Sequence, residues 1–178
     1  MSSSVSPMRV LVVDDCDDAA VTMAFLLKRY GHEVVVAHSG EDALEKAPRF
    51  HPDVLFIDLT MPGIDGFGVA MQLRRMTEFA ETPLVAVSGY VDAEHQSQAS
   101  TAGFTDFLPK PFPLIVLEAT MRRAAARISA AREATKTEQP GAKSSTGRME
   151  ESPRGLADRW PARCPPQRQA IVSHKRSA

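Results

Sequence analysis

Short apolar runs alternate with segments of helical periodicity along the first three quarters of the chain. The expected strands are 8–13, 33–37, 54–58, 84–87 and 105–108. The third, Val54-Leu55-Phe56-Ile57-Asp58, has four large apolar residues in a row before its aspartate, which is typical of a strand buried on both faces. Strands that alternate with helices in this way predict an α/β fold, in which a doubly wound parallel sheet of five strands is covered by five helices.

The segments between these strands have apolar residues at the spacing of a helix with one buried face. The apolar positions of the first helix are Ala20, Met23, Ala24, Leu27 and Tyr30, and those of the fifth are Leu114, Leu117, Met121, Ala125 and Ile128. We expect Asp17 or Asp18 to cap the first helix. We expect Pro48 to end the second helix, because proline disrupts a helix interior. The fourth helix is expected to be weak and polar and to span 93–102.

The composition changes near Lys136, where the helical periodicity stops and Pro, Gly, Ser and Arg become frequent. Residues 1–135 contain 12 Lys+Arg and 18 Asp+Glu, whereas residues 136–178 contain 9 and 4, so an acidic core carries a basic tail. A tail of this composition cannot bury enough apolar surface to offset its ordering entropy. We therefore predict a disordered N-terminus at 1–7, one folded domain at 8–134 and a disordered basic tail at 135–178.

The sequence lacks the features that would place the protein in a membrane or send it through one. No apolar run approaches the ~18 residues of a membrane span. The first residues, Met1 to Pro7, lack the charged and apolar regions of a secretion signal. The two cysteines, Cys16 and Cys164, are isolated and have no metal-site spacing, which favours a reducing compartment. We therefore expect a soluble, cytoplasmic protein.

Polar side chains occur where four of the five expected strands end. Asp14 and Asp15 follow the first strand, Asp58 ends the third, Ser88 follows the fourth and Lys110 follows the fifth. The carboxyl ends of parallel strands meet at one edge of the sheet, where such folds bind ligands. Three carboxylates there repel one another, and all-oxygen ligands without His or Cys favour Mg²⁺. We expect one of Asp14 and Asp15 to bind the metal directly and the other through water; alternatively, this pair caps the next helix.

Together these groups have the chemistry for phosphoryl transfer to a carboxylate. Asp58, at the end of a rigid strand, would act as the nucleophile. Lys110 would neutralise a phosphoryl oxygen as a point charge, and Ser88 would offer its hydroxyl to another. Such catalysis rests on positioning and charge stabilisation. Each residue alone would be interpreted as an ordinary surface residue, so the prediction depends on their occurrence at successive strand ends.

Four motifs carry a resemblance to a known family. They are Val12-Val13-Asp14-Asp15, Asp58-Leu59-Thr60-Met61-Pro62-Gly63-Ile64-Asp65-Gly66, Val87-Ser88-Gly89 and Lys110-Pro111. With these motifs, residues 8–131 resemble the receiver domain of two-component response regulators, including chemotaxis regulators. Three further segments are similar to receivers attached to hybrid sensor kinases: Asp17-Asp18-Ala19-Ala20, Ser88-Gly89-Tyr90 and Ala102-Gly103-Phe104.

This resemblance implies a flavodoxin-like sheet with strand order 2-1-3-4-5 and a phosphoacceptor at Asp58. It implies that Asp15, Asp58 and the backbone carbonyl of Thr60 bind Mg²⁺, while Asp14 assists through a water molecule. The phosphoryl group would come from a histidine kinase or a phosphotransfer protein. The domain would not be an enzyme acting on other substrates, because it would catalyse only its own phosphorylation and dephosphorylation.

The resemblance also implies how the phosphoryl group is held and sensed. Ser88 and Lys110 would contact it, and the Lys110–Pro111 peptide bond would be cis. Ser88 and Phe107 would form the switch, because added charge at Asp58 draws Ser88 inward and lets Phe107 turn into the space. The face formed by the fourth helix, the last strand and the fifth helix would then bind a downstream target protein differently. A weak homodimer through the fifth helix is left open.

Three other interpretations compete with this one. A Mg²⁺-dependent phosphohydrolase needs a general acid beside its nucleophile and a cap, but Leu59-Thr60 follow Asp58 and no insertion is long enough for a cap. A degenerate receiver used only as a scaffold would have no need of Asp58, Ser88 and Lys110. A DNA-associated regulator acting through residues 136–178 would bind with a steep salt dependence. That tail contains no recognition-helix pattern, so nucleic acid is not an expected partner.

Overall fold

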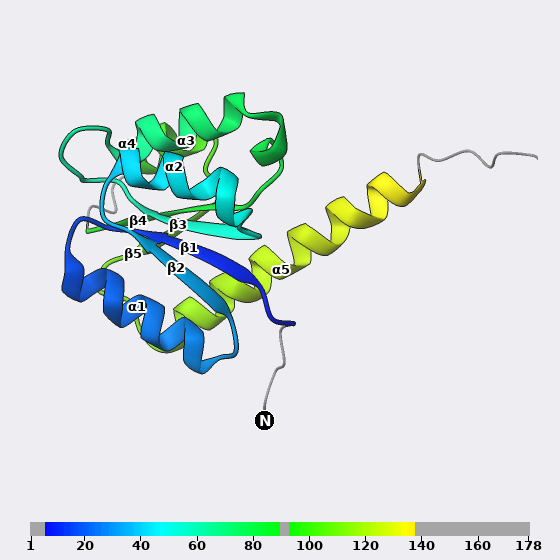
Figure 1. The fold of residues 1–178 in the computed structure, drawn as a ribbon, viewed down its shortest axis with the longest axis horizontal. Helices are drawn as coiled ribbons and strands as arrows, with labels where there is room; N and C mark the ends of the chain where they lie inside the picture. The colour runs from blue at the N-terminus through cyan, green and yellow to red at the C-terminus, as the bar shows by residue number, and fades with distance from the viewer. Residues whose placement is uncertain (1–5, 90–92, 138–178) are drawn as a thin grey trace, which may run out of the picture. The chain divides into compact units, whose positions relative to one another are not determined.

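The computed structural model describes residues 6–89 and 93–137. The elements are β1 (Arg9–Val13), α1 (Asp17–Arg29), β2 (Glu33–Ala37), α2 (Gly40–Phe50), β3 (Val54–Asp58), α3 (Gly66–Arg75), the 3₁₀ turn η1 (Thr77–Phe79), β4 (Leu84–Ser88), α4 (Ala93–Ala102), β5 (Asp106–Pro109) and α5 (Leu114–Thr137). All five strands are parallel, in the order β2-β1-β3-β4-β5. Helices α1 and α5 cover one face of the sheet, and α2, α3 and α4 cover the other (Figure 1). The predicted fold class and strand order are confirmed.

The central strand β3 is buried along its whole length and pairs with β1 on one side and β4 on the other. Its side chains alternate between the two layers, as the period of a strand requires. Leu55 and Ile57 pack into the core beneath α2, α3 and α4, whereas Val54 and Phe56 pack into the core beneath α1 and α5. Apolar contact on both faces fixes this strand, and with it the position of Asp58 at its end.

The start and the end of α1 differ from the prediction. Cys16 is the N-cap, without a side-chain cap bond, and Asp17 and Asp18 lie in the first turn. Carboxylates there still interact favourably with the positive end of the helix dipole, but the prediction that one of them caps the helix was wrong. Tyr30 does not join the buried face either. It is 43% exposed, because the chain leaves the helix at Tyr30 and turns through Gly31, whose φ is +88°.

Pro48 lies inside α2, so the prediction that it ends this helix was wrong. A proline in a helix removes one N–H donor and crowds the carbonyl four residues before it. Here the helix continues only two residues further, to Phe50, so few later bonds depend on the disturbed turn. The helix closes at His51, which has a left-handed φ of 48° and donates its N–H to the Ala47 carbonyl at 2.8 Å.

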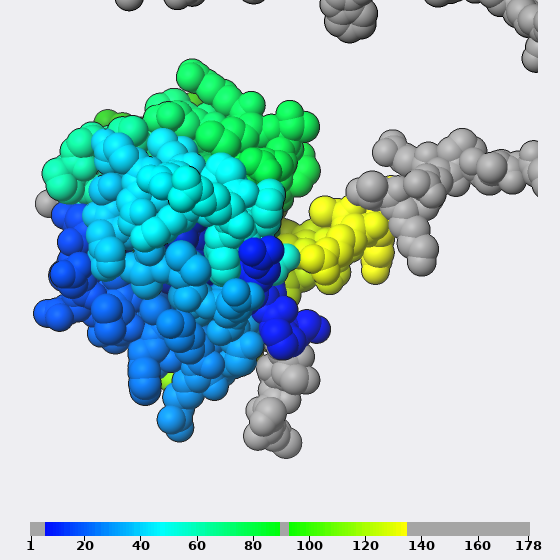
Figure 2. All heavy atoms as spheres, viewed as in Figure 1, coloured from blue at the N-terminus to red at the C-terminus, as the bar shows by residue number. Residues whose placement is uncertain are grey.

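The last helix, α5, continues to Thr137, three residues past the predicted end of the folded domain at 134. Its 24 residues span about 36 Å at 1.5 Å per residue, about twice the length of a five-residue strand. The C-terminal half of α5 therefore extends beyond the sheet (Figures 1 and 2). The remainder of the predicted tail, and residues 1–5 of the predicted disordered N-terminus, lie outside the described residues.

Among the described residues, no helix combines the length and the apolar character needed to cross a membrane.

Candidate functional site

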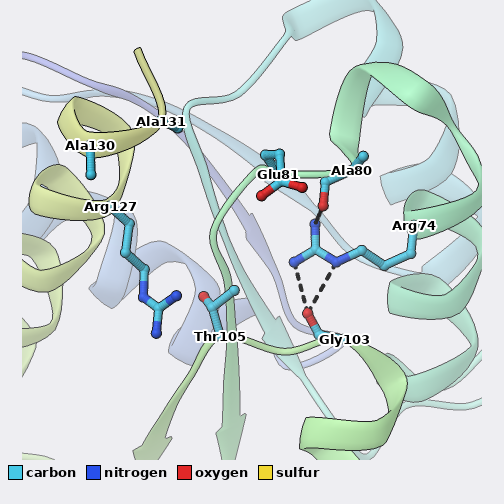
Figure 3. A pocket seen from close by; sticks show the side chains of 8 residues that line it. All are labelled: Arg74, Ala80, Glu81, Gly103, Thr105, Arg127, Ala130 and Ala131. Atoms are coloured by element: carbon cyan, nitrogen blue, oxygen red, sulfur yellow. Dashed lines mark hydrogen bonds between the residues drawn. The ribbon is translucent and has the colours of Figure 1, made fainter. Parts of the chain in front are cut away.

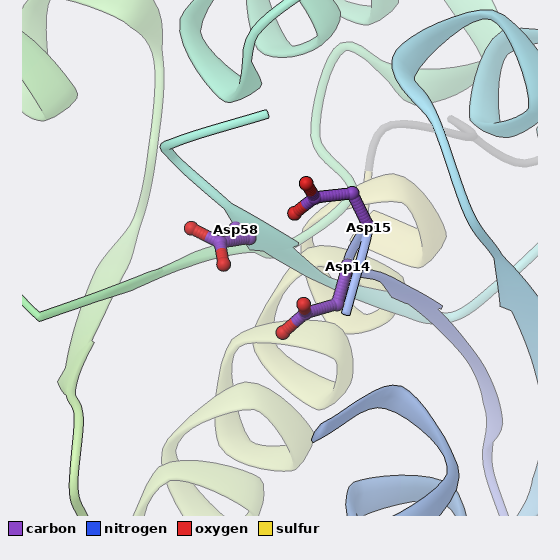
Figure 4. A group of neighbouring side chains, drawn as sticks. All are labelled: Asp14, Asp15 and Asp58. Atoms are coloured by element: carbon purple, nitrogen blue, oxygen red, sulfur yellow. The ribbon is translucent and has the colours of Figure 1, made fainter. Parts of the chain in front are cut away.

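Three carboxylates meet at the carboxyl edge of the sheet. Asp58 is the last residue of β3, and Asp14 and Asp15 follow β1 directly. The two strands are neighbours in the sheet, with Val13 opposite Ile57. One oxygen from each of the three carboxylates lies within 4.8 Å of the others (Figure 4). Because β1 ends at Val13, Asp14 and Asp15 do not follow the alternation of side chains along a strand. Both carboxylates can therefore lie near Asp58.

The ammonium group of Lys110 lies between two of these carboxylates. Its Nζ is 2.6 Å from Oδ2 of Asp14 and 2.6 Å from Oδ2 of Asp58. Burial by itself lowers the pKa of Lys110, but the hydrogen bonds and negative charges of Asp14 and Asp58 outweigh burial and raise the pKa above its ordinary value. Lys110 is therefore held in its charged form.

The backbone around Lys110 is also fixed. Its N–H donates to the Ser88 carbonyl at 2.7 Å, which ties the end of β5 to the end of β4. The Lys110–Pro111 peptide bond is cis, as the resemblance implied.

Asp58 is oriented by the loop that follows it. Its Oδ1 accepts a hydrogen bond from the Thr60 backbone N–H at 2.9 Å, and its Oδ2 faces Lys110. The loop then turns back so closely that a Cβ at Gly66 would lie 2.3 Å from the Asp58 carbonyl oxygen and 2.8 Å from the Leu59 Cα. Only a glycine fits there without a shift of the backbone. Gly66 belongs to one of the receiver motifs, but its packing role could not be predicted from the sequence, because an Asp-Gly pair at a helix start is only a weak signal.

Asp14 and Asp15 differ in their surroundings. Asp14 is 4% exposed; its Oδ1 accepts the Cys16 N–H at 3.0 Å while its Oδ2 binds Lys110. Asp15 is exposed and has no hydrogen-bond or ion-pair partner within 6–89 and 93–137. Neither side chain caps α1, since Cys16 occupies the cap position. A carboxylate without a partner, beside two others, is a donor set that suits a hard cation such as Mg²⁺.

Comparisons with known proteins agree with this geometry. The family model described as the response regulator receiver domain matches residues 10–122. The chain belongs to the response regulator receiver family.

Among curated proteins, this receiver is 30% identical to protein PilG of Pseudomonas aeruginosa over 112 residues, which are 63% of the chain and 83% of PilG. It is 34% identical to the transcriptional regulatory protein PrrA of Mycobacterium tuberculosis over 122 residues, which are 68% of the chain but only 52% of PrrA. The chain therefore spans most of PilG but about half the length of PrrA.

Among solved structures, the chemotaxis protein CheY4 of Vibrio cholerae matches with a TM-score of 0.65 and 29% identity, over 67% of this chain and 99% of CheY4. The receiver domain of sensor histidine kinase PA1611 from Pseudomonas aeruginosa, solved with a magnesium ion in its active-site cleft, has a TM-score of 0.63 over 68% of this chain and 99% of that one. At 22% identity, that second match supports the fold alone.

Ser88 and Phe107, the expected switch residues of this receiver, project to the same face of the sheet. Phe107 pairs in register with Ala86, and Ser88 follows Ala86 by two residues, so all three side chains share one face. Ser88 is 1% exposed, whereas Phe107 is half-buried against the core beneath α2, α3 and α4. Tyr90, the last residue of the Ser88-Gly89-Tyr90 segment, lies outside the described residues.

The structure thus brings Asp14, Asp15, Asp58 and Lys110 into one cluster, with Thr60 beside it. Phe107 is not among these residues; it lies on the edge strand β5, two positions before Pro109.

Proposed function

We propose that this receiver is the phosphoacceptor of a two-component phosphorelay, and that it takes a phosphoryl group from a histidine kinase or a phosphotransfer protein onto Asp58. The observation that carries the proposal is the Lys110 ammonium group, which is shared at 2.6 Å by Asp14 and Asp58. Asp15 lies beside them without a partner among the described residues. A fixed cation next to a strand-end carboxylate is what stabilises the spread negative charge of phosphoryl transfer.

The proposal assigns the metal to the oxygen donors at this edge. Asp15, Asp58 and the backbone carbonyl of Thr60 would bind Mg²⁺ directly, and Asp14 would assist through a water molecule. When bound, Mg²⁺ supplies positive charge to the phosphoryl oxygens. Support comes from the composition of the cluster, which contains carboxylates and no His or Cys ligand, as hard cations prefer.

In the transfer itself, the Asp58 carboxylate attacks phosphorus. The phosphorus–nitrogen bond of a donor phosphohistidine breaks as the new oxygen–phosphorus bond forms, and the electron pair stays with the imidazole. Lys110 exchanges its bond to Asp58 for one to a phosphoryl oxygen, while its bond to Asp14 keeps it in place. The Ser88 hydroxyl binds another phosphoryl oxygen. Each group acts by position and charge.

The proposed output runs from Ser88 to Phe107. Phosphorylation adds nearly two negative charges at Asp58, which draws the Ser88 hydroxyl toward the site. Phe107, half-buried on the same face of the sheet, then turns into the space. The surface formed by α4, β5 and α5 changes shape, and its affinity for a downstream target protein changes with it.

The surface of α1 supports a docking site for the phosphodonor. This helix begins two residues after Asp15. It exposes Val21 (59%) and Phe25 (63%), which lie one turn apart on the same side of the helix. Exposed apolar side chains grouped next to a reactive site mark a protein contact. We assign this contact to the phosphodonor protein. We further propose that the transfer takes place in the cytoplasm.

Intact-mass measurement after incubation with Mg²⁺ and a small-molecule phosphodonor tests the proposal. We expect one phosphoryl group on the wild type and none on Asp58→Asn. Labelling of both proteins would place the acceptor elsewhere. If the folded, Mg²⁺-bound wild type stays unlabelled, the chain is a scaffold and the phosphoacceptor proposal fails.

A further inference from the structure

The charge of the chain reverses sign within helix α5. Residues 1–118 contain 8 Lys+Arg and 17 Asp+Glu, a net charge of −9, whereas residues 119–178 contain 13 and 5, a net charge of +8. The basic part therefore begins in the second turn of α5, well before the tail composition changes near Lys136. Charge asymmetry of this size between two parts of a chain is typical of polyanion binding.

Four arginines lie along the described part of this basic helix, and all four are exposed. Arg123 pairs with Asp106, with Nε 2.6 Å from Oδ2, and Arg132 pairs more loosely with Asp53 at 3.2 Å. Arg122 and Arg127 have no hydrogen bond or ion pair with any residue that the structure describes. Each of these two guanidinium groups keeps its full fork of donors available for phosphate oxygens.

On one side of α5, a hollow of about 220 Å³ separates the helix from the start of β1. Arg122, Ser129 and Arg132 line it together with Asp53. Asp53 does not oppose an anion strongly there, because both of its oxygens are engaged. Its Oδ2 accepts the Arg9 N–H at 2.8 Å, and its Oδ1 pairs with Arg132.

On the other side, Arg127 lines a hollow of about 460 Å³ opposite Arg74 (Figure 3). The guanidinium of Arg74 is already used in hydrogen bonds within the domain, because it donates to the carbonyls of Gly103 and Ala80. Glu81 also lines this hollow and disfavours a small free anion inside it. The cation available to an anionic ligand on this side is therefore Arg127, whose side chain is exposed on the surface of the helix.

Between the arginines, the surface of α5 is built from small residues. Ala126, Ser129 and Ala130 are exposed, and the helix here extends beyond the sheet (Figures 1 and 2). The large apolar side chains that the described part of α5 exposes, Leu114 and Ile115, lie at its other end. A helix that binds a lipid surface needs a large apolar face, so a phosphodiester backbone fits this part of α5 better than a membrane does.

We propose that residues 119–137 of α5 bind the phosphodiester backbone of nucleic acid through Arg122 and Arg127. The contact is electrostatic and independent of base sequence, since it is made by guanidinium groups and small side chains on an exposed helix. It goes beyond the receiver function and does not depend on phosphorylation of Asp58. The proposal also revises the expectation that nucleic acid is not a partner. That expectation rested on charge counts for residues 1–135 and 136–178, which placed the arginines of α5 in the acidic part.

The test uses the full-length protein and a short, fluorescently labelled DNA duplex, with anisotropy titrations over a series of salt concentrations. We expect the wild type to bind, with log K falling linearly against log salt. Each phosphate contact contributes a slope of about 0.9, so Arg122→Gln/Arg127→Gln should lose nearly two units of slope and bind more weakly at low salt. The matched control is Lys28→Gln/Arg29→Gln, which removes the same charge from the exposed end of α1 and should keep the wild-type slope.

Four results would overturn the proposal. They are no binding of the duplex at low salt, equal loss of slope in both double variants, wild-type binding by the Arg122/Arg127 variant, and binding to anionic lipid vesicles instead of the duplex. Circular dichroism and phosphodonor labelling of the same variants confirm that fold and receiver chemistry are intact, so failure here is distinguishable from failure of the phosphoacceptor proposal.

Discussion

Lys110 and Asp14 lie 96 residues apart in the chain, yet Nζ of Lys110 is 2.6 Å from Oδ2 of Asp14. The contact joins the loop after the edge strand β5 to the end of β1, across the two strands that separate them in the sheet. The same ammonium group binds Asp58. One cation therefore compensates two carboxylates of a three-carboxylate cluster, which makes the stability of the protein sensitive to Lys110 and to Mg²⁺ together.

Replacing Lys110 with methionine should lower the free energy of unfolding in metal-free buffer. Hydrogen bonds to charged groups contribute about 1.5–3 kcal/mol each, and the carboxylates left behind repel one another, so we expect a loss of about 2–3 kcal/mol. Mg²⁺ should restore much of this loss because it supplies the missing charge. Urea unfolding with and without Mg²⁺ measures both effects. Lys28→Met, on the exposed side of α1, is the control, and an equal loss there would refute a specific role for Lys110.

Asp15 should control metal binding without stabilising the metal-free protein. It is exposed and has no partner within the described ranges, so Asp15→Asn removes repulsion and no bond. Mg²⁺ should stabilise the wild type by about 2.7 kcal/mol at a concentration 100 times its dissociation constant, and Asp15→Asn should lose most of that gain. Thermal unfolding at increasing Mg²⁺ concentration is the measurement. Asp18→Asn, an exposed neighbour in the first turn of α1, should respond like the wild type; a matching loss there would exclude Asp15 as a specific ligand.

Residues whose positions depend only on strand ends were predictable from the sequence. Asp58 and Lys110 end up together because a parallel sheet collects the carboxyl ends of its strands at one edge, and apolar runs mark those ends. Local backbone geometry was harder to predict from the sequence. Whether Cys16 or Asp17 caps α1 depends on which residue leaves the helical φ and ψ values first, and Pro48 is accepted inside α2 because the helix ends two residues later.

The length of α5 was underestimated for a different reason. Apolar periodicity marks only the part of a helix that packs against something, and the last residue of α5 packed against the core is Ile128. The predicted domain therefore ended at 134, although the helix continues to Thr137. Dividing the charges at residue 136 then assigned Arg122, Arg127 and Arg132 to the acidic domain. The structure shows these three arginines on one continuous helix. The reversal of charge appears when the charges are counted on either side of residue 119, within that helix.

His32 should make the stability of the domain depend on pH. It is buried, its Nδ1 accepts the Met8 N–H at 3.2 Å, and burial lowers its pKa below the ordinary value of 6.5. Folding therefore favours the neutral ring. Its contribution is complete above about pH 6.5 and is lost as the pH falls from there toward the folded-state pKa, because the unfolded chain binds the proton first.

Urea unfolding of the wild type and of His32→Asn between neutral and mildly acidic pH measures this contribution. Asparagine keeps an acceptor near the Nδ1 position but does not titrate, so the variant should lose less stability on acidification. The other histidines are present in both proteins, and their effects cancel in the comparison. Parallel curves for the two proteins would contradict the assignment to His32.

The apolar surface of α1 should matter for a protein phosphodonor and not for a small one. Val21→Ser/Phe25→Ser removes the two exposed side chains without touching the carboxylates or Lys110. Losing the burial of a phenylalanine costs about 1.5–3 kcal/mol, so kcat/KM for phosphotransfer from a phosphorylated histidine protein should fall at least about tenfold. Labelling by a small-molecule phosphodonor should stay at the wild-type rate. Met71→Ser, which removes an exposed side chain from α3 on the other face of the sheet, should change neither rate. If both rates fell in the α1 variant, the side chains would be supporting the site itself, and α1 would not be the donor surface.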